Sequence, residues 1–267
     1  MKNIIAASFL IATLFSCKKT ETTIDNSKIT KDSVKVEEVK FSVDSVKVSD
    51  STKLTAKITE SFDASVLQFP SIKDKTLQDS IYSKTNLKLA SYSKEDLQKG
   101  LQDQKQKYFA DNKKNIGDYL GDFKQTWNQN SSMKLFNKDE NLMTLQYTGD
   151  GFSGGAHGYY YEFYKNFDLK NNKTIQLKDV LTTTDAKIWD PIMMKNFLKN
   201  KNYTKELLFD KRIPLNNNFY YDKTSLHFVY GQYEIAPYVA GTINIDVPFS
   251  EISKYLTPGF KQMNNIK

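Results

Sequence analysis

The residues best suited to chemistry lie in one glycine-rich stretch. It covers residues 147–168 and reads YTGDGFSGGAHGYYYEFYKNFD, with five of the chain's eleven glycines and one of its two histidines, His157. Glycines cluster where the backbone takes a positive φ angle or lets another group approach closely. The pattern therefore predicts an unusual loop between two strand-like segments, and any functional chemistry is expected beside that loop.

Two chemical motifs overlap in this loop, and both require a helix that the sequence does not predict. Residues 149–154 fit G-x-G-x-x-G, in which the loop opens a helix whose N-terminal amides bind pyrophosphate. Residues 151–155 fit G-x-S-x-G, in which Ser153 would be a nucleophile served by a downstream histidine such as His227. The aromatic run that follows, residues 159–164, favours a strand. This disfavours nucleotide binding and serine hydrolysis, although a hydrolase using carboxylates, or Ser153 with His227, stays an alternative.

Metal and cofactor binding find little support in the sequence. The two histidines, His157 and His227, lie seventy positions apart, and the chain has one cysteine, Cys17. A metal site would need both histidines together with carboxylates from elsewhere. We expect no metal and no cofactor, with His157 bonded to the backbone of its own loop and His227 half-buried in a strand.

A second loop is predicted at residues 230–241, which read YGQYEIAPYVAG. Tyrosines between glycine and proline are common on binding surfaces because their rings are rigid and amphipathic. The alternative is that these rings plug the end of a sheet and bond to the backbone through their hydroxyls. The candidate ligand-binding residues, chosen on or beside the two glycine-bearing loops, are Phe152, Ser153, His157, Tyr159, Tyr233 and Tyr238.

The N-terminus predicts export and lipid anchoring. A basic residue and a short apolar run form a signal peptide over residues 1–16, too short to span a bilayer as a permanent helix. Residues 14–17 read LFSC and resemble the bacterial lipobox, so Cys17 is expected to be lipidated and to hold the protein on a membrane. Residues 17–33 are polar and predict a flexible tether. The expected location is the bacterial cell envelope, periplasmic or at the surface.

The charge of the chain argues against nucleic acid as a partner. The formal net charge is +7, yet Arg212 is the only arginine. Arginine reads phosphates and base edges through its two-pronged guanidinium, so a nucleic-acid interface without it is not expected. The lysines are spread along the whole chain, as on a solvated surface.

Strand and helix patterns predict an α+β fold with largely antiparallel sheets and a few helices. We expect two subdomains that divide near Gly121. The first, residues 34–121, combines strands and helices, and the second, residues 122–267, is an α+β unit that contains the glycine-rich loop.

In the first part, alternating valines predict a hairpin that turns at residues 49–51. Helices are predicted over residues 74–87 and from Ser93, a good N-cap, to Ile116. In the second part, polar turns are predicted at residues 128–132 and 137–140. The remaining predicted elements are a helix capped by Thr184 or Asp185, strands at 219–221, 225–230 and 240–247, and a terminal helix at 248–256.

Three segments together resemble a known family of bacterial envelope domains. They are Ser153–His157, Asn166–Leu169 and Tyr233–Gly241. A domain with these motifs forms the extracellular, lysozyme-sensing part of RsiV-type anti-sigma factors and the N-terminal half of PdaC-type peptidoglycan deacetylases. The resemblance covers about Val36 to Leu256 and implies binding of lysozyme, peptidoglycan or another envelope component.

The resemblance implies binding rather than catalysis. The sigma-binding segment of the RsiV type and the catalytic domain of the PdaC type are not expected in this chain. A basic protein would repel a basic lysozyme unless a local acidic patch overrides the mean charge, and anionic peptidoglycan is the easier electrostatic match. An envelope hydrolase acting on glycan or ester bonds and a purely structural lipoprotein are the alternatives.

Overall fold

The structure is a computed structural model that describes residues 40–116 and 123–266. The expected signal peptide, the tether at residues 17–33 and the lipidation site Cys17 lie outside this described part. Within it, no helix combines the length and the apolar character that crossing a membrane would require.

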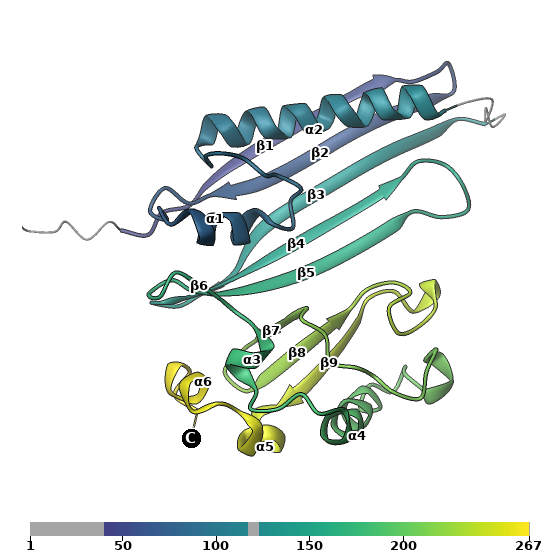
Figure 1. The fold of residues 1–267 in the computed structure, drawn as a ribbon. Helices are drawn as coiled ribbons and strands as arrows, with labels where there is room; N and C mark the ends of the chain where they lie inside the picture. The colour runs from purple at the N-terminus through teal and green to yellow at the C-terminus, as the bar shows by residue number, and fades with distance from the viewer. Residues whose placement is uncertain (1–39, 117–122, 267) are drawn as a thin grey trace, which may run out of the picture. The chain divides into compact units, whose positions relative to one another are not determined.

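The larger of two sheets has six strands in the order β1-β2-β3-β4-β5-β6 (Figure 1). Its strands are β1 (Asp44–Lys53), β2 (Ile58–Gln68), β3 (Gln125–Lys138), β4 (Leu142–Phe152), β5 (Tyr159–Asp168) and β6 (Lys173–Ile175). The strands β2 and β3 run parallel, and the other neighbours run antiparallel. Parallel neighbours need a long crossover, and helices α1 (Lys75–Tyr82) and α2 (Lys94–Asn115) lie in that connection. The predicted α+β class with mostly antiparallel sheets is confirmed.

Both helices of the crossover begin where the sequence predicted, although α1 ends at Tyr82 and not at residue 87. The Asp74 carboxylate accepts a hydrogen bond from the Leu77 amide at 2.7 Å, and the Ser93 hydroxyl accepts one from the Asp96 amide at 3.1 Å. Such caps satisfy amides that have no partner inside the helix. The predicted helix from Ser93 to Ile116 is confirmed, since α2 ends with Ile116 as its C-cap.

Two of the three predicted polar turns in this sheet are wrong, whereas the one predicted at residues 137–140 overlaps the turn between β3 and β4. Residues 49–51 continue β1, and the hairpin turns instead at residues 54–57, where Leu54 and Thr55 amides donate to the Ile58 carbonyl. Residues 128–132 lie in the middle of β3. They are polar because alternate side chains face away from the helices, where the Asn128 and Asn130 amides both donate to Asp150 at 2.9 Å.

The face of the large sheet opposite to Asn128 and Asn130 packs under α1 and α2 and forms the first hydrophobic core. Phe62, Leu97, Tyr147 and Phe167 are buried at its centre. The hydroxyl of Tyr147 donates to the Ile81 carbonyl at 2.6 Å, which satisfies a polar group that would otherwise be costly to bury. Burial of this side chain raises the pKa of the Tyr147 phenol well above its ordinary value.

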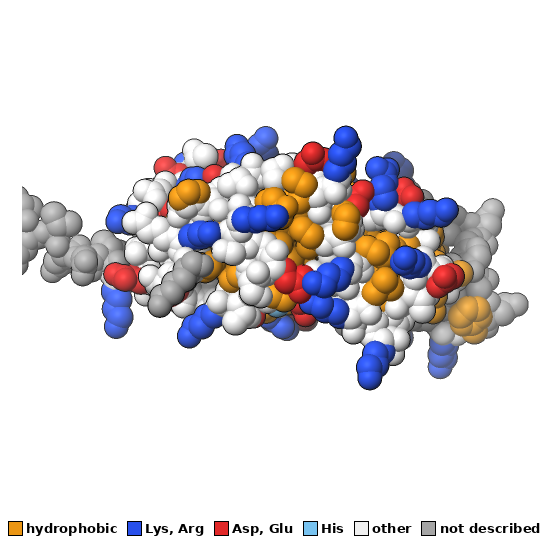
Figure 2. Space-filling model, turned by 90° about the horizontal axis from the view of Figure 1, so that it is seen from below, with side chains coloured by type: hydrophobic (Ala, Val, Ile, Leu, Met, Phe, Trp, Pro, Cys, Tyr) orange, Lys and Arg blue, Asp and Glu red, His pale blue; other side chains and the backbone are white. Residues whose placement is uncertain are grey.

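A second core lies between a three-stranded sheet and a set of helices. The sheet contains β7 (Phe219–Tyr221), β8 (Ser225–Tyr230) and β9 (Ile243–Pro248), and the helices are α3 (Leu177–Val180), α4 (Ala186–Phe197), α5 (Phe249–Ile252) and α6 (Pro258–Met263). Trp189, Phe228 and Phe260 are buried between them. Viewed from the side of α4 and α5, lysine side chains are scattered over the surface with acidic ones among them (Figure 2).

Several sequence predictions in this part need correction. Asp185 caps α4 as predicted, but β9 begins at Ile243, because Tyr238–Ala240 forms a short 3-10 turn instead of strand. The terminal helix predicted at residues 248–256 is α-helical only over Phe249–Ile252 and continues as a 3-10 helix over Ser253–Tyr255. The helices α3 and α6 were not predicted, since each has at most six residues and carries little periodic signal.

The two cores do not follow the expected division near Gly121. Strands from both sides of that position pair in one sheet, because β2 contacts β3 along residues 58–65 and 125–132. The first core ends in sequence at Phe167 and the second begins at Ile175. The boundary expected between residues 121 and 122 thus falls in the connection between two paired strands.

Side-chain amides join the free edge of β5 to the segment around β7. The Asn218 side chain accepts from the Tyr164 amide and donates to the Glu162 carbonyl, both at 2.8 Å. The Asn166 side chain donates to the Phe219 carbonyl at 2.8 Å. These bonds continue the hydrogen-bonding pattern of a sheet without a further strand, and they hold β7 beside β5.

Candidate functional site

The two glycine-bearing loops meet, although they lie about 80 residues apart in the sequence. The ring of His157 stacks on that of Tyr238, with centroids 4.0 Å apart and planes inclined by 24°. The hydroxyl of Tyr233 lies 3.4 Å from Nε2 of His157. We call these three residues, His157, Tyr233 and Tyr238, the aromatic cluster.

The hydrogen bonds of His157 fix which ring nitrogen carries the proton in the neutral ring. Its Nδ1 lies 3.0 Å from the carbonyl oxygen of Gly158. A carbonyl oxygen only accepts, so Nδ1 donates and Nε2 is left to accept from the Tyr233 hydroxyl. His157 is thus bonded to its own loop, as the sequence indicated, and also to the second loop.

Unusual backbone conformations shape both loops. Gly154 and Gly155 have φ angles of 90° and 91°, which glycine adopts without strain. Tyr233 has a φ of 62°, a conformation that side chains other than glycine, asparagine and aspartate rarely take. The Gln232 side chain accepts a hydrogen bond from the Tyr160 amide at 3.0 Å and so ties the second loop to β5. A strained tyrosine held by such contacts is typical of functional positions.

The surface around the aromatic cluster is apolar and exposed. Tyr233 is 55 % exposed, Tyr159 is 49 % exposed and Val239 is 87 % exposed. The adjoining chain positions carry carboxylates: Glu234 follows Tyr233 and accepts from the Gly231 amide at 2.8 Å, and Glu162 accepts from the Tyr160 hydroxyl at 3.2 Å. Burial and the nearby Glu162 raise the pKa of the Tyr160 phenol to about 12. Large exposed apolar side chains gathered in one place mark interaction surfaces.

The other candidate residues lie beside the cluster and take no part in its ring contacts. The Tyr159 ring stacks with that of Tyr161 at 6.4 Å on the face of the sheet that α2 covers. Phe152 ends β4 and is half-buried. Ser153 is exposed, and its hydroxyl makes no hydrogen bond within residues 40–116 and 123–266.

His227 is occupied elsewhere and does not face Ser153. Its Nδ1 lies 2.7 Å from a carboxylate oxygen of Asp246. Its Nε2 lies 3.1 Å from a carboxylate oxygen of Asp222, but this second contact does not have the geometry of a hydrogen bond. Its ring stacks on Tyr220 at 4.4 Å. Burial lowers the pKa of His227, but Asp246 and Asp222 outweigh burial and raise the pKa above its ordinary value. Among the described residues, no cluster of three or more histidine, cysteine or acidic side chains is arranged to hold a metal.

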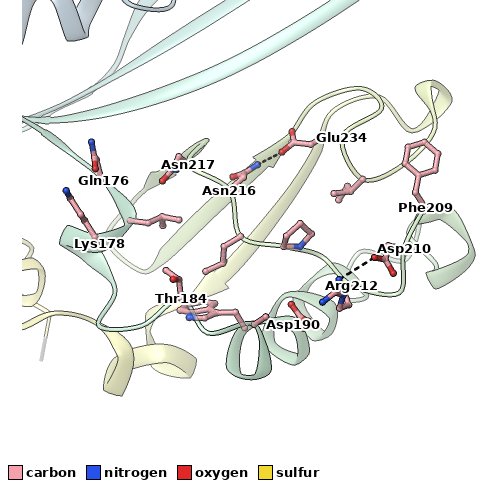
Figure 3. Close-up of a pocket in the computed structure, with 16 residues that line it drawn as sticks. Gln176, Lys178, Thr184, Asp190, Phe209, Asp210, Arg212, Asn216, Asn217 and Glu234 are labelled. Carbon is pink, nitrogen blue, oxygen red and sulfur yellow. Dashed lines mark hydrogen bonds and ion pairs between the residues drawn. The ribbon is translucent and has the colours of Figure 1, made fainter.

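Sequence reasoning missed two adjoining pockets beneath the second loop. The larger one, of about 740 Å³, is drawn in Figure 3. The smaller one has a volume of about 590 Å³. Both are lined by Gln176, Asn216, Asn217 and Glu234. The run of three asparagines at 216–218 was the one local signal that could have located them.

Each pocket has its own charged groups. The larger pocket is lined by Arg212, which lies 3.8 Å from Asp210, and Figure 3 shows this pair at the opposite end from Gln176 and Lys178. Glu234 accepts from the Asn216 side chain at 2.9 Å. The smaller pocket is lined by Lys84 and Lys165.

The family of the chain is established by a match over most of this structure. The sequence profile described as a protein of unknown function, DUF3298, matches residues 77–250. The chain belongs to the DUF3298 family. Both loops of the aromatic cluster and the residues shared by the two pockets lie within the region that DUF3298 covers.

Solved structures of DUF3298 proteins have the same fold. A member from Bacteroides fragilis NCTC 9343 is 20% identical, with a TM-score of 0.69 over 85% of this chain and 97% of its own. A DUF3298 protein from Pseudomonas aeruginosa PAO1 is 15% identical, with a TM-score of 0.58 over 83% of this chain and 96% of its own. No curated protein matches the sequence.

Proposed function

We propose that this DUF3298 protein is a lipid-anchored binding protein of the bacterial cell envelope that captures a lysozyme-type protein without catalysis. The observation that carries the proposal is the contact of His157 with Tyr233 and Tyr238, which fixes two distant loops into one exposed aromatic surface. Tyrosines of this kind supply contact area at a low cost in side-chain entropy and are frequent at binding hot spots.

The shape and polarity of this surface favour a protein ligand over a polysaccharide. Val239 and Tyr233 are largely exposed instead of lining a groove. Glu234 is exposed and follows Tyr233 in the chain, so its carboxylate supplies a negative charge in the second loop that a basic protein would meet, although the chain as a whole carries +7. The lipobox-like sequence before Cys17 and the resemblance to RsiV-type sensor domains support the envelope location and the lysozyme-type ligand.

Binding is measured by calorimetry of residues 34–267 against a purified lysozyme and against soluble peptidoglycan fragments, each at low and high salt. We expect saturable binding of lysozyme that weakens with salt, because part of the attraction is electrostatic. Alanine at His157 or Tyr233 should weaken it at least about tenfold, as for a hot-spot residue. Leu198→Ala is the matched control, since Leu198 is 39 % exposed and lies after α4.

Each other outcome contradicts a stated part of the proposal. Unchanged affinity of both alanine variants would remove the aromatic cluster as the contact site. Binding of peptidoglycan alone would change the ligand class. Release of products from glycan or ester substrates would support the hydrolase alternative, and an absence of all binding would favour a structural lipoprotein.

A further inference from the structure

Lys165 carries a half-buried ammonium group that has only neutral partners. It projects from β5 toward the end of α1, where it donates to the Ser80 carbonyl at 2.7 Å, the Ser80 hydroxyl at 2.8 Å and the Ser83 hydroxyl at 2.9 Å. Within the described part of the chain, no carboxylate lies at ion-pair distance from it. Buried charges in proteins are normally paired, so this ammonium group has its hydrogen bonds satisfied but has no opposite charge beside it.

A second cation stands beside the same pocket and adds to this imbalance. The Lys84 ammonium lies 4.4 Å from the centre of the Phe163 ring and, in the described residues, has no carboxylate partner either. Burial, together with repulsion from Lys84, lowers the pKa of Lys165 to about 8. An anion placed between the two lysines would relieve both the desolvation and the repulsion.

Two of the three asparagines that line the smaller pocket are held by hydrogen bonds within the protein, and the side-chain amide of the third has no such bond among the described residues. Asn216 and Asn218 use their side chains in bonds to Val229, Glu162 and Tyr164, so they form a rigid wall. The exposed side chain of Asn217 has no hydrogen-bond partner among residues 40–116 and 123–266. Apolar walls are supplied by Phe163, Ile175 and Phe219.

We propose that the pocket bordered by Lys84, Lys165 and Asn217 binds a small organic carboxylate that also carries an amide group. The two ammonium groups match the carboxylate, and the free side chain of Asn217 matches the amide. Glu234 lines the same pocket and disfavours a doubly charged phosphate more than a singly charged carboxylate. This site is separate from the aromatic cluster, and the proposal does not depend on capture of a lysozyme.

Two sources share this ligand chemistry, namely acylated sugar acids and acylated amino acids. The probes are therefore N-acetylmuramic acid and N-acetyl-D-alanine, titrated into the full chain and followed by calorimetry. N-acetylglucosamine is the matched neutral probe, because it has the acetamido group without the carboxylate. We expect at least one acid to bind and the neutral sugar to bind about tenfold more weakly or not at all.

Charge-removing variants test the residues directly. Lys84→Gln and Lys165→Met should each weaken binding of the acid about tenfold. Lys99→Gln removes the same charge from an exposed pair with Asp103 on α2 and should leave the affinity unchanged. Lys84 is exposed, so Lys84→Gln decides the matter if Lys165→Met fails to fold. Equal binding of acid and neutral probes, no binding of either acid at millimolar concentration, or unchanged affinity in Lys84→Gln would overturn the proposal.

Discussion

The ring of Tyr161 on β5 lies across Gly149 on β4, so that a β-carbon at position 149 would overlap the hydroxyl end of the ring. The neighbouring pair repeats the arrangement, because a β-carbon on Gly151 would come within 2.6 Å of the Tyr159 ring. These two glycines therefore belong to a strand covered by aromatic rings, and the loop that the sequence indicated is confined to residues 153–158.

We expect Gly149→Ala to lower the free energy of unfolding by about 1–2 kcal/mol, as for overpacking in a core. The Tyr161 ring cannot easily move aside, because it stacks on Phe163 at 5.5 Å and neighbours Tyr159. Urea unfolding measures the change. In a Tyr161→Ala background the same substitution should cost little, and an equal cost in both backgrounds would rule out the ring as the cause. Gly259→Ala, with open space around its β-carbon, is the control.

Removal of one ring from the aromatic cluster should loosen the second loop. Tyr238→Ala deletes the stack on His157 and is expected to cost about 1 kcal/mol, with faster amide hydrogen exchange at residues 231–241. Tyr238→Phe retains the ring and should behave like the wild type. Exchange rates that stay unchanged in Tyr238→Ala would mean that the loop is held without this contact.

The stability contributed by His227 should depend on pH. Its pKa is raised by Asp246 and Asp222 against the opposing effect of burial, so its contribution is complete below the ordinary pKa of 6.5 and disappears as the pH rises through the folded value. The difference in unfolding free energy between the wild type and His227→Gln should be larger at pH 6 than at pH 9. A difference that is constant over this range would show that the pKa of His227 is the same in the folded and the unfolded protein.

Lys165 should give the opposite dependence on pH. Its pKa is lowered to about 8 by burial and by Lys84, so the folded state loses a proton that the unfolded state keeps up to its ordinary pKa of 10.5. The resulting penalty is present below pH 8 and fades as the pH rises toward 10.5. Stability of the wild type relative to Lys165→Met should therefore increase between pH 8 and 10, measured by urea unfolding at each pH.

Lipid anchoring through Cys17 predicts a change of location. We expect Cys17→Ala to move the protein from the membrane fraction to the soluble fraction and to abolish incorporation of labelled fatty acid. Ser16→Ala keeps a small residue before the cysteine and should leave the protein on the membrane. An unlabelled wild-type protein would contradict lipidation.

The starts of three helices were predicted correctly from the sequence, whereas contacts between distant segments were not predicted. Ser93 and Asp185 cap their helices within three positions and were recognisable as caps in the sequence, and the helix predicted from residue 74 begins after its cap Asp74. The polar run 128–132 was misread as a turn, because its place in a strand depends on Asp150, which reaches it only through the folded sheet.

For the candidate site too, the sequence located the loops but not the contacts between them. Glycine and tyrosine composition located both loops around His157 and Tyr233, although their contact could only be seen in the structure. The pocket at Lys165 left no local pattern, since Ser80 precedes it by 85 positions. A lysine in a strand of tyrosines gives no indication of which hydroxyls surround it.

The amide bonds along β5 have a consequence for contacts with other molecules. Tyr160, Glu162 and Tyr164 present backbone groups on the side of β5 away from β4, and side chains of Gln232 and Asn218 occupy them. An exposed row of such groups would recruit a strand from another protein and start aggregation. Along this stretch the long sheet is closed by side chains from its own chain, which protects it against strand addition among crowded neighbours.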